Sequence, residues 1–284
     1  MRVSKYIKKW FPVFALPTTL AFTLAFLVPF AMGIWLSFTK FRTVSDAQWV
    51  GLSNYTTAFT ENNDFLHALW FSVRFTVVSV VTVNVLAFAL AMILTKAIKA
   101  TNLFRAVFFL PNLIGGIVLG YVWQLLINGI LGKLFQQDLT YSSAYGFWGL
   151  VVVTNWQMIG YMMVIYIAGI QNIPGDVIEA ADIDGAGFWR RLVQVTIPMV
   201  ASSITICVFL TLTNSLKLFD QNLALTAGAP GHETEGLSLN IFRTFYNVRN
   251  HQGVAQAKAV VFFVIVAAIA FVQLRATRSK EEEG

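Results

Sequence analysis

Long apolar segments alternate with short polar ones along the whole chain. A helix that crosses the hydrocarbon core of a bilayer needs about 20 mainly apolar residues, so the pattern predicts six spanning helices in an all-α integral membrane protein. Their runs without Asp, Glu, Lys or Arg cover residues 11–39, 75–95, 106–132, 139–175, 192–216 and 259–274. The last run is short. We therefore expect its helix to begin near Val254, with Lys258 extending its ammonium group to the polar interface.

Composition favours a membrane protein over a pair of soluble domains. Of the 284 residues, 57% are hydrophobic and 12% are charged, whereas soluble domains carry about 25% charged residues. The first apolar run has no charge from Phe11 to Phe38, which is longer than the apolar region of about 7–15 residues in a signal peptide. No small-residue cleavage site closes this run, so we expect a retained first span.

The positive charges predict the orientation of the chain. With the N-terminus in the cytoplasm, twelve of the 20 Lys and Arg residues fall in short cytoplasmic segments near span ends, as the positive-inside rule requires. Both termini are then cytoplasmic. The twelve are Arg2, Lys5, Lys8, Lys9, Lys96, Lys99, Arg105, Arg190, Arg191, Arg275, Arg278 and Lys280. No basic stripe with interleaved aromatic residues indicates a nucleic-acid partner.

One charged, amphipathic segment, EAADIDGAGFWRRLVQVTIPM at residues 179–199, lies in the predicted cytoplasmic loop between the fourth and fifth spans. Asp176 is placed to cap a new helix there, with Glu179 as its capping-box partner. The turn signal Asp184-Gly185 predicts two short helices joined at Gly185. The alternative to a functional segment is an interfacial helix with solvated acidic residues, in which Glu179 is only a helix cap.

The same segment resembles the EAA signature of binding-protein-dependent ABC importer permeases. Glu179, Ala180, Ala181 and Gly185 match that signature position by position, and the closing VTIP departs only conservatively from the family's Ile-x-Leu-Pro. In that family the loop forms coupling helices that insert into a cleft on a cytoplasmic ATPase subunit. The resemblance thus implies an ATPase-coupling site in residues 176–198, comprising the four matching residues and Asp184.

Further motifs resemble the sugar-type permeases of the maltose and multiple-sugar class. They are WVGLSNY (49–55), FRAVFFLP (104–111), AGIQNIP (168–174), LFDQNLALTAGAP (218–230) and FVQLRATR (271–278). IWLSFTKF (34–41) resembles the first of the two permeases in such systems. One departure is Ala229, where the family has a glycine that is free to adopt positive φ. The other is His251-Gln252-Gly253, where an aromatic residue often precedes the glycine. We therefore expect the loop around Ala229 to differ in geometry.

The resemblance implies the type I ABC importer permease fold and import of a sugar, with an oligosaccharide as the favoured substrate, across the cytoplasmic (inner) membrane of a prokaryote. The implied partners are a second homologous permease, two ATP-binding-cassette ATPase subunits and an extracytoplasmic binding protein. This chain would bind no cofactor, and the ATPase would use ATP and Mg. The expected division is an N-terminal span and exofacial segment (1–65), a transmembrane core (66–275) and a cytoplasmic tail (276–284).

Transporters place their substrate near the bilayer midplane, among polar and aromatic groups. By resemblance to the maltose-type permease, the substrate pathway maps onto Asn112, Gly116, Thr154, Tyr161, Thr211 and Ser215. The alternative for any one of these polar residues is a hydrogen bond between helices or to its own backbone. Lys217 and Asp220 have the spacing of an ion pair on one helix face, and a structural pair is the expectation for them; a gate residue that contacts the docked binding protein is the alternative.

Other function classes find little support in the sequence. There is no GxxxxGK[ST] motif, so nucleotide hydrolysis must come from another chain. His67, His232 and His251 all lie in or next to predicted exofacial loops, which leaves no histidine pair to hold haem or a metal at bilayer depth. An importer of a polyol or glycerol phosphate is an alternative. A secondary transporter is a further one, although Asp220 is the only acidic residue in or at the edge of a span.

Overall fold

The computed structural model describes residues 3–61, 64–96 and 100–281. The chain forms two compact units, one made of residues 1–62 and 241–263 and the other of residues 63–240 and 264–284. Helices α13 (Leu237–Tyr246) and α14 (Gln252–Glu281) each contribute to both units. Arg2 and Lys99, which the sequence places on the cytoplasmic side, and the tail residues 282–284 lie outside the described residues.

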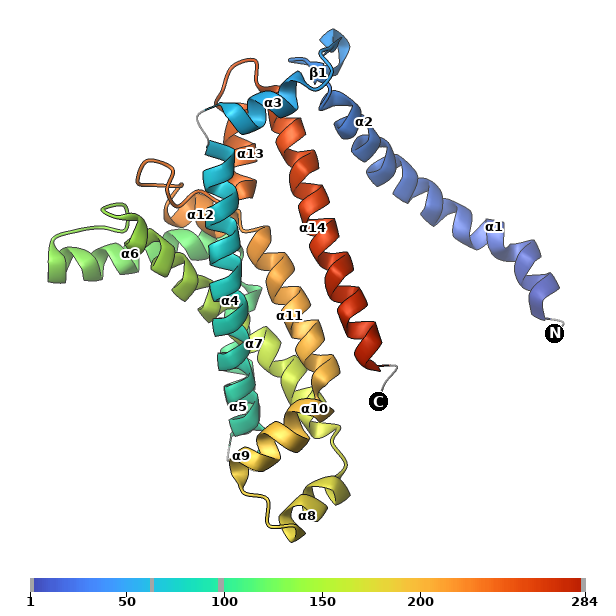
Figure 1. Cartoon of the computed structure of the whole chain (residues 1–284), viewed down its shortest axis with the longest axis vertical. Coiled ribbons are helices and arrows are strands. Elements are labelled where there is room, and N and C mark those ends of the chain that lie inside the picture. Colours follow the sequence, from blue (N-terminus) through green and yellow to red (C-terminus); the bar gives the residue numbers. More distant parts are fainter. Residues whose placement is uncertain (1–2, 62–63, 97–99, 282–284) are drawn as a thin grey trace. The chain divides into compact units, whose positions relative to one another are not determined.

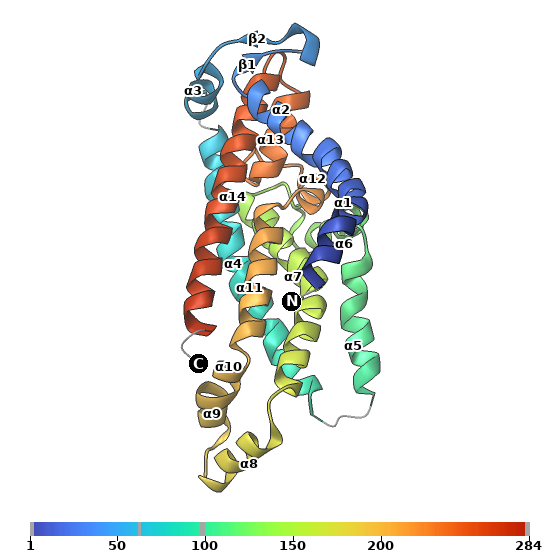
Figure 2. The same cartoon turned by 90° about the vertical axis from the view of Figure 1, so that its right-hand side faces the viewer.

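The larger unit is built from helices. In chain order they are α4 (Asp64–Leu94), α5 (Thr101–Phe109), the 3₁₀ turn η3 (Leu110–Leu113), α6 (Gly116–Phe135), α7 (Ser143–Gln171), α8 (Gly175–Ile183), α9 (Phe188–Arg191), the π-helical turn η4 (Leu192–Thr196), α10 (Ile197–Met199), α11 (Ala201–Leu216) and α12 (Asp220–Leu225). The helices α4, α7 and α11 lie side by side, and α8 and α9 lie at one end of this bundle (Figures 1 and 2).

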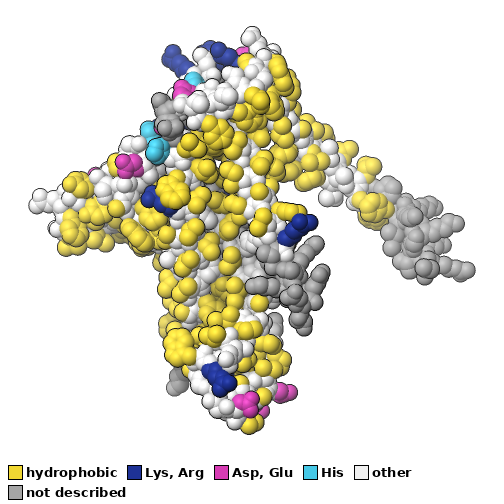
Figure 3. Space-filling view, viewed as in Figure 1, with side chains coloured by type: hydrophobic (Ala, Val, Ile, Leu, Met, Phe, Trp, Pro, Cys, Tyr) yellow, Lys and Arg dark blue, Asp and Glu magenta, His cyan; other side chains and the backbone are white. Residues whose placement is uncertain are grey.

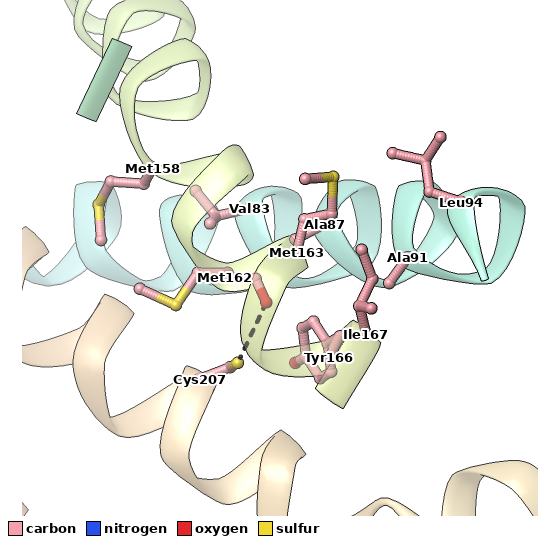
Figure 4. Close-up of a cluster of buried hydrophobic side chains, with 10 residues drawn as sticks. All are labelled: Val83, Ala87, Ala91, Leu94, Met158, Met162, Met163, Tyr166, Ile167 and Cys207. Atoms are coloured by element: carbon pink, nitrogen blue, oxygen red, sulfur yellow. Dashed lines mark hydrogen bonds between the residues drawn. The ribbon is translucent and has the colours of Figure 1, made fainter. Parts of the chain in front are cut away.

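Helix α7 is the centre of the bundle, because 67% of its most hydrophobic stretch is buried inside the protein. Small residues on α4, among them Ala87 and Ala91, are fully buried against Met162 and Met163 of α7 and Cys207 of α11 (Figure 4). The Cys207 thiol donates to the main-chain carbonyl of Met162 at 3.7 Å. Packing of this kind, with small residues that let helix backbones approach, is what holds helices together in a bilayer.

The predicted all-α class and the count of six spans agree with the structure when one bent helix pair is counted as a span. Within the described residues, five helices are long and apolar enough to cross a membrane, and the sixth span is the pair Phe188–Met199 and Ala201–Leu216, bent by 73°. The span expected from the run at 106–132 is found at Gly116–Phe135, and the first residues of the run belong to the separate helix α5. Pro111 and the extended backbone at Ile114 and Gly115 separate α5 from α6, since proline lacks the N–H that continues a helix.

The smaller unit contains α1 (Val3–Phe22), the π-helical turn η1 (Thr23–Leu27), α2 (Val28–Leu36), β1 (Thr39–Lys40), the 3₁₀ turn η2 (Val44–Asp46), β2 (Gln48–Trp49) and α3 (Ser53–Thr60). The two short strands pair antiparallel, with Thr39 opposite Trp49. Within this unit Phe30 of α2 packs edge-on against Phe263 of α14, with ring centroids 4.8 Å apart.

The WVGLSNY motif has a structural role in this unit. Buried Asn54 donates from Nδ2 to the carbonyl oxygens of Ser37 and Thr39, both at 2.8 Å. A Cβ on Gly253 of α14 would stand 2.1 Å from the Thr39 carbonyl oxygen. Asn54 and Gly253 therefore join the end of α2, the strand β1 and the start of α14.

Replacing Asn54 with Asp should destabilise the protein by about 2–4 kcal/mol, because two buried carbonyls lose their donor and a carboxylate is buried in its place. A fall in the midpoint of thermal unfolding in detergent would measure this. Asn247→Asp, at an exposed position of the same unit, is the matched control and should leave the midpoint unchanged. Equal midpoints for the two variants would contradict the role assigned to Asn54.

The sequence predicts that Lys258 extends its side chain outward, but the structure buries this side chain within the protein. Its side chain is buried, and Nζ donates to the Thr244 hydroxyl oxygen at 2.9 Å. Both residues belong to the smaller unit. Because α13 supplies an acceptor beside α14, the ammonium group has a hydrogen-bond partner within the protein.

Candidate functional site

A cavity of about 600 Å³ opens among α6, α7, α11 and α12 of the larger unit. It is lined by Asn112, Gly116, Thr154, Gln157, Met158, Tyr161, Asn214, Lys217, Leu218, Phe219, Asp220 and Gln221. Four of the six residues assigned to the substrate pathway from the sequence meet here: Asn112, Gly116, Thr154 and Tyr161. The lining is rich in amides, with one hydroxyl, one phenol and two charges.

The other two residues of that set, Thr211 and Ser215, lie outside the lining. Thr211 is fully buried, donates to the Cys207 carbonyl at 2.7 Å and accepts from Nδ2 of Asn84 at 3.3 Å. Tyr166 completes the set by donating to Oδ1 of Asn84 at 2.7 Å. These bonds link α4, α7 and α11 in the manner of polar residues that join membrane helices. Ser215 is buried, and its hydroxyl has no partner among the described residues.

Gly116 is set in the cavity wall by a close approach of helices. A Cβ at this position would stand 2.6 Å from the Cβ of Asp220, and one at Gly120 would stand 2.6 Å from the Cβ of Ala224. Glycines one turn apart on α6 therefore let α12 pack directly on the α6 backbone. This contact fixes the start of α12, and with it Asp220, at the cavity.

The structure adds polar residues that were not assigned to the pathway. Gln221 donates from Nε2 to Oε1 of Gln157, whose own Nε2 donates to the Ile114 carbonyl at 3.1 Å. Asn214 uses its Nδ2 on the Leu210 carbonyl at 2.8 Å. The sequence marks Gln157 and Asn214 as polar residues inside apolar runs, but Gln221 follows the end of its run and carries no such signal.

The expected ion pair between Lys217 and Asp220 is not formed. Helix α11 ends at Leu216 and α12 begins at Asp220, so the two side chains do not share one helix face. The backbone of Phe219 (φ −134°, ψ −63°) breaks the helical path between them. Both side chains face the cavity instead.

The loop after α12 is held by one buried asparagine. Asn222 donates to the Thr234 carbonyl at 2.7 Å and accepts from the Gly236 N–H at 2.8 Å. In this loop the residues with positive φ are Ala227, Gly228 at +83°, Gly231 and His232. Ala229 is not among the residues with positive φ, and alanine therefore fits its place in the GAP sequence without strain.

The charged loop contains the two short helices predicted from Asp184-Gly185. Helix α8 ends in a Schellman motif. Gly185 has φ +72°, the Ala186 N–H donates to the Ala181 carbonyl, and the Gly185 N–H donates to the Asp182 carbonyl. The predicted cap is wrong. Pro174 occupies the N-cap position without a side-chain bond, and Asp176 lies inside the first turn.

Glu179 is consequently not used as a cap and lies exposed on α8. Ala180, Asp184 and Gly185 are also exposed, and Ala181 is half-buried. Asp182 forms an ion pair within the loop, where it accepts from Arg191 at 2.6 Å. Two large apolar side chains stand out beside this acidic surface, with Ile183 86% and Trp189 74% exposed. The space-filling view shows charged and hydrophobic side chains together at this end of the bundle (Figure 3).

Comparison with protein families identifies a match to the model for the binding-protein-dependent transport system inner membrane component, over residues 99–279. The chain is 43% identical to the "Probable starch degradation products transport system permease protein" of Thermoanaerobacterium thermosulfurigenes, covering 99% of this chain and 98% of that one. It is 28% identical to the multiple sugar-binding transport system permease protein of Streptococcus mutans, covering 99% and 100% of the two chains.

Among solved structures, a chain of a bacterial ABC transporter involved in the import of the acidic polysaccharide alginate superposes with a TM-score of 0.81. The identity is 18%, and the alignment covers 98% of this chain and 99% of that chain. This likeness confirms the predicted importer permease fold.

Proposed function

This chain belongs to the binding-protein-dependent transport system inner membrane components, and from this we propose that it is one of two related permease subunits of an ATP-driven sugar importer. It is a multi-pass transport component of the prokaryotic inner membrane and not an enzyme. The finer proposal concerns where the ATPase docks, which substrate passes through the cavity and which other chains complete the transporter.

The observation that carries the proposal of ATPase docking is the free acidic and apolar surface of α8 and α9. Glu179 has no capping role, and Ile183 and Trp189 expose apolar area next to it. We assign Glu179, Ala180, Ala181, Asp184 and Gly185 to the coupling surface. A carboxylate can pair with an arginine of the ATPase, while Ile183 fills an apolar pocket.

A sugar fits the cavity for chemical reasons. Its lining offers amides and a hydroxyl for sugar hydroxyls and the ring of Tyr161 for their C–H faces. Related chains carry the names of starch-product and multiple-sugar permeases. We infer an oligosaccharide as the substrate. Asn112, Gly116, Thr154 and Tyr161 would form the pathway wall, and Thr211 and Ser215 would support it from behind.

The remaining parts come from other chains. A second permease would complete the channel, and two ATPase subunits would bind ATP and Mg and dock on the coupling loops, here residues 176–198. An extracytoplasmic binding protein would deliver the sugar to the loops at 40–66, 128–146 and 220–253. Closure of the ATPases would draw the coupling helices together and change the side to which the cavity opens.

Co-purification tests this assembly. The tagged chain, expressed with its native neighbours and extracted in mild detergent, should bring down an ATP-binding-cassette ATPase and a second permease in stoichiometric yield. A chain recovered alone, folded and stable, would contradict the proposed assembly and favour an autonomous transporter.

A further inference from the structure

The cavity holds one cationic and one anionic side chain, and neither has an ion-pair partner among the described residues. Lys217 is exposed at the end of α11, and Asp220 is half-buried at the start of α12. The ion pairs within the described part of the chain join other residues, Asp182 with Arg191, Glu235 with His232 and Glu61 with His251. Two charges thus face the cavity with their hydrogen-bonding capacity unused.

Several neutral groups in the wall are unused as well. The Thr154 hydroxyl is buried and has no partner within the described residues. The Nδ2 of Asn214 donates to the Leu210 carbonyl, which leaves its Oδ1 as an acceptor for a ligand. The amides of Gln157 and Gln221, by contrast, are oriented by each other and by the Ile114 carbonyl. The wall therefore combines a fixed amide pair with unfilled donors and acceptors.

Asp220 is the better positioned of the two charges. The Cβ of Asp220 packs against the backbone of Gly116. A Cβ added at Gly116 would stand only 2.6 Å from it. The close packing of α12 on α6 leaves this carboxylate little freedom to withdraw. Lys217, on a long exposed side chain, can adjust its position.

These two charges match a neutral sugar better than an acidic one. A carboxylate accepts hydrogen bonds from two neighbouring hydroxyls, and an ammonium group donates to a third. A uronic acid can use the ammonium group but brings its own carboxylate near Asp220, and like charges in a partly dehydrated cavity repel. The hydroxyls of a neutral sugar engage both groups.

We propose that Asp220, with Lys217, makes this cavity select neutral oligosaccharides over uronate-bearing ones. The proposal rests on the proposed function, since it takes the cavity to be the sugar pathway. Asp220 is then a specificity-determining residue that contacts the sugar directly. It accepts hydroxyl hydrogens from a neutral sugar and repels a carboxylate.

The test is direct binding to the purified complex of permeases and ATPases in nanodiscs, without the binding protein, whose own selectivity would otherwise mask that of the cavity. The probes are maltotriose and a mannuronate trimer, and the readout is calorimetry. The wild-type complex should bind maltotriose at least about tenfold more tightly. Asp220→Asn should weaken maltotriose binding about tenfold and bring the ratio of the two affinities close to one.

Two variants control for folding. Asp220→Glu keeps the charge and should retain the preference for maltotriose. Asp138→Asn removes a carboxylate outside the cavity, where it accepts from the Thr140 N–H at 2.8 Å in an exposed turn. Although Asp138 lies in a loop assigned to the binding protein, that protein is absent from this assay, so the variant should bind both trimers with wild-type affinities. Equal recovery of the complex for all variants shows that assembly is intact.

An unchanged affinity ratio in Asp220→Asn, or a wild-type preference for the mannuronate trimer, would overturn the proposal. So would a wild-type complex that imports sugar into proteoliposomes but binds neither trimer, while the importer function would stand. A complete complex that imports no sugar would instead defeat the proposed function.

Discussion

Replacing Glu179 with Lys is expected to abolish substrate uptake while leaving the folded chain in the membrane. The side chain is exposed and has no capping bond to lose, so the substitution should cost the chain itself less than about 0.5 kcal/mol. At the ATPase interface it would replace a charge-assisted hydrogen bond with a repulsion. Loss of such a bond costs about 2–5 kcal/mol, which weakens docking at least about 30-fold.

Asp176→Lys is the matched control for Glu179→Lys. It reverses an exposed acidic charge in the first turn of the same helix. Asp176 is at the start of the coupling loop but is not one of the five residues assigned to the coupling surface. Uptake should fall no more than a few-fold, because an unfavourable charge at a helix N-terminus costs about 0.3–1 kcal/mol. Both variants are compared by uptake and by the amount of ATPase that co-purifies. Wild-type uptake in Glu179→Lys would remove Glu179 from the coupling surface.

The second large effect is expected from Gly160→Ala, which should prevent stable folding of the larger unit. A Cβ at this position of α7 would stand 1.8 Å from the Phe108 carbonyl oxygen and 2.3 Å from its carbon. The atoms in the way belong to the backbone of α5, so no side chain can rotate aside. Overpacking a core with one extra group costs about 1–3 kcal/mol, and moving a helix backbone should exceed that range.

Gly129→Ala is the control for Gly160→Ala, because Gly129 lies in α6 with nothing within 4 Å of an added Cβ. Alanine there should stabilise the helix slightly, by up to about 1 kcal/mol. Membrane yield and the midpoint of thermal unfolding in detergent distinguish the two variants. A Gly160→Ala chain with wild-type yield and midpoint would show that α5 and α7 do not pack as closely as described.

The sequence predicts the larger features because they depend on local pattern. Apolar runs predict the spans, and the Asp184-Gly185 signal predicts the two helices of the charged loop. Each is a property of a continuous stretch of chain. The Schellman turn at Gly185 shows how a local signal and the final structure coincide when no distant contact competes.

The errors have a common physical origin in contacts between distant segments. Lys258 is buried because α13 offers it Thr244. The break before Asp220 removes the expected i, i+3 pair with Lys217. Neither spacing nor periodicity carries this information. For the same reason Thr211, which looks like any polar residue in a span, is found in a network with Asn84 and not in the cavity wall.

The measurement that tests the central claim most directly is sugar uptake by proteoliposomes. They would contain this chain, the second permease and the ATPase, with the binding protein and labelled maltotriose outside and ATP and Mg inside. Accumulation that requires ATP, the binding protein and an intact Glu179 is the expected result. Uptake that persists without ATP and instead follows an ion gradient would contradict the account and identify a secondary transporter.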